Sequence, residues 1–350
     1  MGILKFFDEY RKKIMPKIMG EVGDGHFEKY VDVNKQIPIK KILICRPNHR
    51  LGNLLLTTPL IQELENTFQG CEIDIIVKGG LSKIIFREYH SIRSIIILPR
   101  KPFNQLFKYI KVWVSVYFKK YDLVINAVDG SSSGRLLTKA AKSLYKIFGD
   151  FDIDNQELSA DFYHISKRPI YNLRHYLNRV GHTTLNTEIG HLDLRLTDKE
   201  LIKGQDILNE LVGLKKPTLA IFTYATAPKC YSKSWWSSFY KILEDKFANT
   251  HHLLEILPIE NISQIDFKTT TYYSKDVREI CSVIAHCDLF IGADSGMMHL
   301  ASASKTTTIG LFSETDDNEY GTYGNESYNI NTNESEDLEV EAERMRQLLL

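Results

Sequence analysis

Residues 288–312 read DLFIGADSGMMHLASASKTTTIGLF, and this stretch places a helical segment between two apolar runs. The apolar runs have the length and composition of buried strands. A helix that follows a strand so closely directs its first backbone N–H groups, which have no partners inside the helix, toward the connecting turn. These donors and the helix dipole favour an anion such as a pyrophosphate at the turn. The expected elements are a strand at 288–293, a helix at 297–304 and a strand at 307–312.

The side chains of this turn suit phosphate binding, but each also has an ordinary structural role. Gly296 leaves room where a phosphate would approach, Ser295 can donate its hydroxyl, and Met297 offers a backbone N–H group. Asp294 stands at the helix start, where a carboxylate commonly caps the helix by accepting backbone N–H groups. His299, near the first helical turn, could contact a ligand or belong to the core.

Strand-like and helical patterns alternate twice along the chain. Continuous apolar strands separated by helices indicate parallel sheets covered on both faces. With 350 residues the chain also exceeds the usual size of a single core. The sequence therefore predicts an α/β fold of two Rossmann-like, doubly wound domains facing a central cleft, with ligand loops at the carboxyl ends of the strands. The expected parts are an N-terminal helical extension at 1–38, a first domain at 39–196 and a second domain at 197–350.

The two ends of the chain have helical patterns. Residues 3–15 could form an amphipathic helix, which would either dock on the protein's own core or touch a membrane surface. Residues 336–350 are expected to form a helix that braces the domains. Further strands are expected at 41–45, 72–77, 94–98, 122–127, 217–222 and 252–257, and further helices at 59–68, 103–118, 172–180, 235–247 and 276–286.

Composition excludes several classes of protein. The chain has 44 Lys and Arg against 44 Asp and Glu, so it has no overall field that would attract nucleic acid. Its five cysteines are scattered without a Cys-x-x-Cys pair, which favours buried, reduced thiols over a metal site or disulfides. Without a long apolar run or the apolar core of a signal peptide, the chain is expected in the cytoplasm.

Three motifs occur in order along the chain. In the first, a strand reaching Arg46 is followed by Gly52-Asn53, an apolar run and Thr58-Pro59. The second is Lys233-Ser-Trp235-Trp236, and the third runs from Asp294-Ser-Gly-x-x-His299-Leu-Ala through Leu311-Phe-x-x-Thr315-Asp316 to Tyr320-Gly-x-Tyr-Gly324. Together they resemble the motifs of glycosyltransferase family 9, the ADP-heptose:lipopolysaccharide heptosyltransferases, although Trp236 stands where that family usually has Pro.

The resemblance implies an inverting, metal-independent glycosyltransferase of the GT-B type that needs no cofactor. It implies transfer of a sugar, with heptose from ADP-heptose as the first expectation, onto a lipopolysaccharide core or another surface glycan. The second domain would hold the donor, and the enzyme would work in the cytoplasm or at the inner face of the cytoplasmic membrane. Lys233 matches the family's motif, while Thr223 and Thr226 follow a strand, where a ligand loop is expected. The expected donor residues are Thr223, Thr226, Lys229, Lys233, Asp294, Ser295, Gly296, Met297 and His299.

The general base is where this chain departs from the family. The family has Gly-Asp after the first strand, and its Asp is thought to deprotonate the acceptor, but this chain has Gly52-Asn53. Because an amide has no useful basicity near neutral pH, Asn53 cannot do this work. His49, in the same loop, is the first substitute, since an imidazole titrates near neutral pH, and Asp129 is the second.

The acceptor and a metal are less well defined by the sequence. Arg46, Arg50 and Arg135, with Gly52, could bind an anionic acceptor, although exposed arginines are often only solvated. The acidic run Asp150-x-Asp152-x-Asp154 has the spacing of a divalent-cation site, but it lies outside the motifs and is interpreted as a solvated loop. The rival hypothesis is a catalytically degenerate nucleotide-sugar-binding protein that acts as a partner or sensor, which Asn53 supports and Lys233 opposes.

Overall fold

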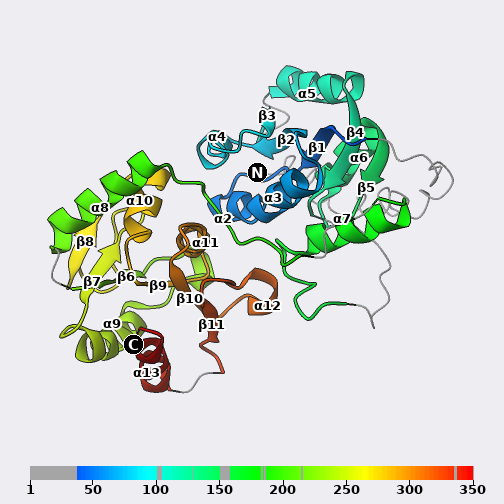
Figure 1. The fold of residues 1–350 in the computed structure, drawn as a ribbon. Helices are drawn as coiled ribbons and strands as arrows, with labels where there is room; N and C mark the ends of the chain where they lie inside the picture. The colour runs from blue at the N-terminus through cyan, green and yellow to red at the C-terminus, as the bar shows by residue number, and fades with distance from the viewer. Residues whose placement is uncertain are drawn as a thin grey trace, which may run out of the picture. The chain divides into compact units, whose positions relative to one another are not determined.

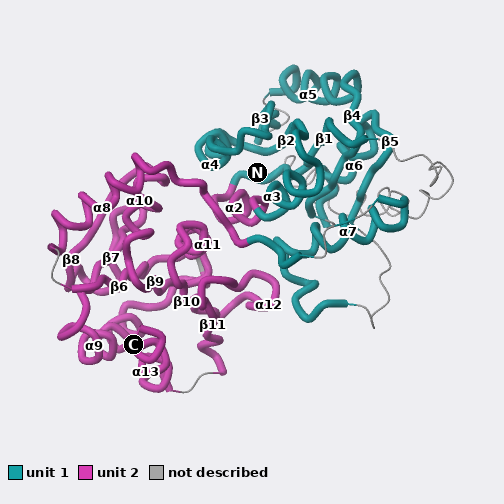
Figure 2. The backbone as a smooth tube through the Cα atoms, in the orientation of Figure 1, with its two compact units in different colours: residues 1–49, 59–190 teal, residues 50–58, 191–350 magenta. Residues whose placement is uncertain are grey.

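The structure is a computed structural model that forms two compact units (Figure 2). The N-terminal unit comprises Met1–His49 and Pro59–Gly190, and the C-terminal unit comprises Arg50–Thr58 and His191–Leu350. The described residues are 38–100, 105–128, 130–149, 158–182, 184, 187–213, 216–334 and 337–349. Residues 1–37, Asp129 and the acidic run at 150–154, on which several sequence-based expectations fall, lie outside these ranges.

The N-terminal unit is built on a parallel sheet with the strand order β3-β2-β1-β4-β5 (Figure 1). Aliphatic runs such as Ile42–Ile44 are fully buried, as expected for strands covered on both faces. The order reverses beside β1, which is the switch point of a doubly wound sheet. The strands are β1 (Lys41–Cys45), β2 (Glu72–Lys78), β3 (Ile92–Leu98), β4 (Lys120–Asn126) and β5 (Lys142–Ile147).

Helices cover this sheet because each turns an apolar stripe toward it. Val116 and Leu137, from two different helices, pack on the same core as Leu43 and Val124 of the strands. The helices of this region are α3 (Thr58–Thr67), α4 (Ser82–Ile85), α5 (Leu106–Phe118), α6 (Ser132–Ala140) and α7 (Arg168–Arg179).

The C-terminal unit contains a second parallel sheet, with the order β11-β10-β9-β6-β7-β8. Its strands are β6 (Thr218–Phe222), β7 (His252–Ile256), β8 (Thr270–Tyr272), β9 (Leu289–Ala293), β10 (Thr307–Phe312) and β11 (Tyr328–Asn331). Its helices are α2 (Leu51–Leu55), α8 (Asp198–Val212), η3 (Ala227–Lys229), α9 (Lys233–Phe247), α10 (Val277–Ile284), α11 (Gly296–Ala303), α12 (Asp317–Tyr320) and α13 (Leu338–Leu348). The helix expected to brace the domains, α13, packs on α9 of its own unit, where Met345 shares a core with Trp236.

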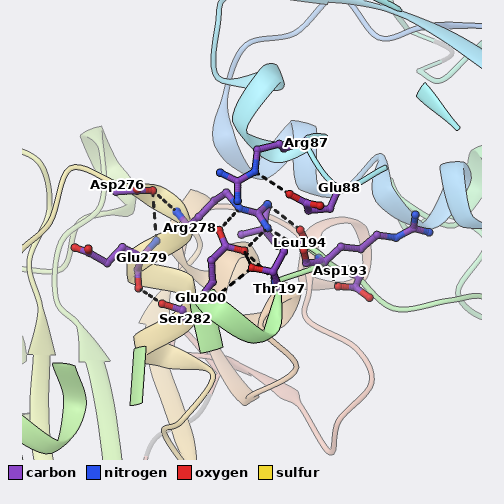
Figure 3. A network of polar contacts seen from close by, with 11 residues as sticks. Arg87, Glu88, Asp193, Leu194, Thr197, Glu200, Asp276, Arg278, Glu279 and Ser282 are labelled. Atoms are coloured by element: carbon purple, nitrogen blue, oxygen red, sulfur yellow. Dashed lines mark hydrogen bonds and ion pairs between the residues drawn. The ribbon is translucent and has the colours of Figure 1, made fainter. Parts of the chain in front are cut away.

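A buried ion pair joins two helices of the C-terminal unit (Figure 3). Arg278 of α10 donates to both carboxylate oxygens of Glu200 in α8, at 2.6 and 2.8 Å, and also to the carbonyl oxygen of Leu194. The hydrogen bonds from Arg278 lower the pKa of Glu200 to about 2. Thr197 caps α8 and forms a capping box with Glu200, so one carboxylate fixes both the helix start and the contact between helices.

The expected elements and the observed ones agree where apolar runs are long. The strand expected at 307–312 is β10 with the same bounds, and the other expected strands shift by at most a few residues. The sequence did not predict β5, β8, β11, α6 or α8. For α8 a signal was available, because Thr197-x-x-Glu200 is a capping-box pattern. Residues 50–58 pack with the C-terminal unit, although the expected boundary placed them in the first domain.

Candidate functional site

The turn between β9 and α11 has the strand–turn–helix geometry that the sequence predicted. The N-cap of α11 is Ser295, whose hydroxyl oxygen accepts the backbone N–H of Met298 at 3.4 Å. The expectation that Asp294 caps the helix is therefore wrong. Ser295 has the extended backbone that an N-cap needs, whereas the carboxylate of Asp294 is engaged by two side chains from other loops.

Asp294 is buried and connects three loops of the C-terminal unit. Its Oδ2 atom accepts hydrogen bonds from Lys229 Nζ and Thr315 Oγ1, and its backbone N–H donates to the carbonyl oxygen of Leu311 at 3.0 Å. Lys229 follows β6, Asp294 follows β9, and Thr315 follows β10, which are neighbouring parallel strands. The three side chains therefore meet at the carboxyl edge of the sheet, where ligands of such folds bind. Thr315 belongs to the quoted motif but was not selected as a site residue.

The two candidate lysines have different surroundings. Lys229 has a side chain 34% exposed and bonds to the buried Asp294. Lys233, the first residue of α9, is 60% exposed and pairs with Asp266, which is 62% exposed. An exposed ion pair contributes little free energy. Lys233 can therefore exchange its carboxylate partner for a ligand at small cost, while Lys229 is held in place by Asp294.

Thr223, expected to bind the donor, has its hydroxyl occupied inside the protein. It donates to Glu255 Oε1 at 2.6 Å and accepts the backbone N–H of Gln264 at 3.1 Å. Thr226, the other expected threonine, is exposed. Glu255 of β7 is fully buried, and burial raises the pKa of its carboxyl group. Sequence reasoning missed Glu255, although an acidic residue inside the apolar run 252–257 was a signal.

A close contact between two glycines holds α2 against α11. A Cβ atom on Gly52 would lie 2.6 Å from His299 Cδ2, and one on Gly296 would lie 3.0 Å from Leu51 Cβ. The missing side chain of Gly296 thus allows α2 to approach α11 closely. His299 is buried with its ring against Gly52, in the position of a packing residue. The partly buried Met297 lies in the first turn of α11.

The expected base and acceptor residues are divided between the two units. His49 is exposed at the end of the N-terminal unit, and its backbone N–H donates to Asn48 Oδ1. Asn53 is partly buried in α2 of the C-terminal unit, where its carbonyl oxygen accepts the hydroxyl of Thr57 at 2.9 Å. Arg46 is buried just after β1, while Arg50 is the exposed N-cap of α2. Arg135 in α6 has its guanidinium carbon 5.9 Å from the ring centroid of Phe148.

The described residues contain no group of three His, Cys, Asp or Glu side chains that could hold a metal ion. All five cysteines are free thiols, and burial raises the pKa of Cys45 to about 12. A pocket of about 460 Å³ in the N-terminal unit is lined by Lys83, Arg87, His90 and Arg93 among others. It lies near the amino end of β3, whereas ligands of parallel sheets bind at the carboxyl ends.

Comparison with known proteins shows similarity to one family of glycosyltransferases. The model of glycosyltransferase family 9 (heptosyltransferase) matches residues 260–349, which include Asp294, α11 and Thr315. Lipooligosaccharide heptosyltransferase 2 of Campylobacter jejuni is 24% identical over 297 residues, covering 79% of this chain and 82% of that protein. Lipopolysaccharide heptosyltransferase 3 of Escherichia coli K12 is 24% identical over 285 residues, covering 76% and 80%. The resemblance to glycosyltransferase family 9 is thus confirmed, by the family model over residues 260–349 and by relatives along most of the chain.

Solved structures share the fold of this chain. A family-9 glycosyltransferase from Veillonella parvula has a TM-score of 0.65 at 16% identity, covering 89% of this chain and 90% of that one. The E. coli heptosyltransferase WaaC with ADP has a TM-score of 0.61 at 16% identity, covering 88% and 98%. The prediction of two Rossmann-like domains of the GT-B type is confirmed.

Proposed function

We propose that this family-9 glycosyltransferase transfers heptose from ADP-heptose to a lipopolysaccharide-type core acceptor, with inversion and without a metal ion. The curated relatives are named as lipooligosaccharide and lipopolysaccharide heptosyltransferases. WaaC, which has the same fold, has been solved with ADP and with ADP-2-deoxy-2-fluoro heptose. The acceptor of such enzymes is attached to lipid, so we place the reaction at the inner face of the cytoplasmic membrane.

The observation that carries this proposal is the bond from Lys229 to Asp294 beside the start of α11. A nucleotide-sugar reaction needs positive charge where the leaving diphosphate becomes more negative, and charge already in position stabilises that transition state most. Asp294, which also accepts a hydrogen bond from Thr315, holds Lys229 at the turn, where backbone N–H groups and the helix dipole add to its field. Lys233 then contributes a second ammonium by leaving Asp266 for the diphosphate.

In an inverting transfer the acceptor hydroxyl attacks the anomeric carbon while the bond from that carbon to the diphosphate oxygen breaks. The electron pair of the broken bond leaves with ADP, and the proton of the hydroxyl passes to a base. Asn53 cannot accept this proton. We assign the role to His49, an exposed imidazole in the segment between β1 and α2, with Asp129 as the alternative. Arg46, Arg50 and Arg135 are the proposed contacts to anionic groups of the acceptor.

The test is a measurement of ADP release with ADP-heptose and a panel of heptose-free and heptose-containing core acceptors, each with and without a chelator. We expect acceptor-dependent release that the chelator leaves unchanged, and a product with inverted anomeric configuration by NMR. ADP-glucose and a UDP-sugar serve as donor controls. Tight ADP-heptose binding without turnover on any acceptor would favour the rival, a degenerate binding protein. Loss of activity with the chelator would overturn metal independence.

A further inference from the structure

Helix α5 of the N-terminal unit exposes a continuous apolar face. Phe107 is 91% exposed and Phe118 is 72% exposed, at opposite ends of the helix. Phe107, Ile110, Val114 and Phe118 follow one another at intervals of three or four residues and so share one side of the helix. The other large exposed apolar residues of this helix are Leu106 and Tyr117.

This exposed face is not needed to hold the helix on the sheet. Val116 is fully buried, and Tyr109, Val112 and Trp113 pack against the core that contains Leu43 and other strand residues. These four positions form a separate stripe, which already attaches the helix to the protein. In the other helices that the structure describes, exposed apolar residues such as Ile202 and Val340 do not form such a run. A contiguous apolar face of this size marks an interaction surface.

The charged residues of α5 itself are both lysines. Lys108 and Lys111 lie on α5, and the helix contains no acidic residue. Lys119, which follows the helix, pairs with the buried Asp74, whereas Lys108, Lys111 and Lys120 are exposed to solvent. Lys142 of β5 lies 4.5 Å from the ring centroid of Tyr117, at the C-terminal end of the face. The face therefore combines aromatic and aliphatic side chains with lysines that are available to an anionic partner.

The length of α5 limits how it can meet a bilayer. Its 13 residues span roughly 20 Å, which is shorter than the hydrocarbon core of about 30 Å. No helix among the described residues is long and apolar enough to cross a membrane. A short helix with an apolar face and flanking lysines instead lies along the interface, with its rings between the acyl chains and the headgroups.

We propose that α5, together with Lys120 and Lys142, is a docking surface for an anionic lipid bilayer. Phe107 and Phe118 enter the interface, and the lysines contact the headgroups. Charge complementarity favours this occupant over a second copy of the chain, since two such faces would bring lysines against lysines. Figure 1 shows α5 at the periphery of the N-terminal unit. The inference concerns where the protein works, so it does not require that the proposed sugar transfer be correct.

The test is co-sedimentation of the full-length protein with vesicles of phosphatidylcholine alone or mixed with phosphatidylglycerol, in the absence of substrates. We expect binding only to the anionic vesicles, weakened by salt. The Phe107→Ser and Phe118→Ser double variant should lower the partition coefficient by at least about tenfold. Lys108→Gln and Lys111→Gln should each lower it by about fivefold. The control is Ile202→Ser with Val340→Ser, which removes two exposed apolar side chains of the C-terminal unit, 63% and 62% exposed.

Each other outcome overturns the proposal. If the wild-type protein does not co-sediment with anionic vesicles, α5 is not a membrane-docking surface. Equal binding by all variants would assign the membrane contact to another part of the chain, such as residues 3–15. Gel filtration that shows a dimer dissociated by Phe107→Ser and Phe118→Ser would make a second copy the occupant. Because both rings face solvent, unchanged thermal unfolding of the double variant shows that its effect is not a loss of folding.

Discussion

Each of the two units buries a carboxylate within its sheet, but the two carboxylates differ in how many hydrogen bonds they accept. Asp74 of β2 accepts hydrogen bonds from Arg93, Lys119 and Tyr121, the last at 2.9 Å. Burial raises the pKa of Asp74, but these hydrogen bonds outweigh it, so the pKa is lowered. Glu255 of β7 accepts from Thr223, while its Oε2 atom has no hydrogen-bond partner in the part of the chain that the structure describes.

This difference suggests two roles: Asp74 is a charge that stabilises the fold, and Glu255 is a group that arranges the candidate site. Asp74 of β2 bonds to Arg93, near the start of β3, and to Lys119 and Tyr121, at the start of β4. These contacts lie at the amino edge of the sheet, where ligands do not bind. Glu255 orders Thr223 and, through it, the backbone of Gln264, both in loops that leave the carboxyl edge. A partly satisfied buried group is costly to the fold. Its presence beside the ligand edge therefore points to a role in arranging those loops.

The largest effect is expected for the substitution that tests which unit supplies the general base. His49→Ala in the N-terminal unit should lower turnover by about 10² to 10⁴ and leave donor affinity nearly unchanged, because proton transfer matters only in the transition state. Steady-state kinetics with calorimetric ADP-heptose affinity measures both. If Asn53→Asp in the C-terminal unit sharply raises turnover while His49→Ala has no effect, the natural chain is an impaired enzyme and the base assignment is wrong.

Asp74→Asn should reduce the free energy of unfolding by about 1.5 to 3 kcal/mol, because a neutral amide weakens the hydrogen bonds that Arg93, Lys119 and Tyr121 make with the buried carboxylate. Urea denaturation measures this. The lowered pKa means that the carboxylate stabilises the fold above its ordinary value of 3.8, and that this contribution is lost as the pH falls through the lowered value. The control is Glu72→Gln, whose exposed pair with Arg93 should contribute about 0 to 1 kcal/mol. Equal losses of stability in the two variants would show that the buried Asp74 contributes no more than the exposed Glu72.

Lys229→Ala and Lys233→Ala should each weaken ADP binding by about 1.5 to 3 kcal/mol, the range for a charge-assisted hydrogen bond. Calorimetry on folded variants measures the affinity. Asp266→Asn is the matched control, since it removes the exposed partner of Lys233 and should leave ADP affinity unchanged or slightly higher. A lysine whose removal leaves the affinity unchanged does not belong to the donor site.

Gly52→Ala should destabilise the C-terminal unit by about 1 to 3 kcal/mol, because the added methyl group would lie 2.6 Å from His299 Cδ2. Alanine otherwise suits a helix, so a loss cannot come from the backbone of α2. Gly80→Ala in the N-terminal unit, where a Cβ meets nothing within 4 Å, is the control and should be close to neutral. Unchanged thermal stability of Gly52→Ala would show that α2 and α11 can separate without cost.

The smallest effect is expected for Glu255→Gln, within about 1 kcal/mol of the natural protein near neutral pH, since it replaces a poorly satisfied buried acid by a neutral group. Because the pKa of Glu255 is raised, the protonated carboxyl group contributes to the stability of the fold. This contribution is fully present below the ordinary pKa of 4.5 and is lost as the pH rises through the raised pKa. The variant should therefore gain stability relative to the natural protein as the pH rises. A difference that stays constant with pH would show that Glu255 is equally ionised in both states.

The candidate site was only partly predictable. Asp294, Ser295 and Lys229 follow strands that the sequence revealed, so their arrival at one edge of a parallel sheet could be inferred. Their bonds could not, because an Asp before a helix looks the same whether it caps that helix or accepts from a lysine on another loop. Thr315 and Glu255 were missed for the same reason, since only their spatial neighbours distinguish them from other polar residues.

The sequence by itself determined the alternation of buried strands and helices, the turn before α11 and the resemblance to glycosyltransferase family 9. These depend on residues close together in the chain, where periodicity and turn chemistry are visible. Only the tertiary structure decided that Gly52 meets His299, that Lys229 bonds to Asp294, and that the second apolar stripe of α5 stays exposed. A helix has the same apolar pattern whether a stripe meets its own core or a partner, and the order of strands decides which loops come together.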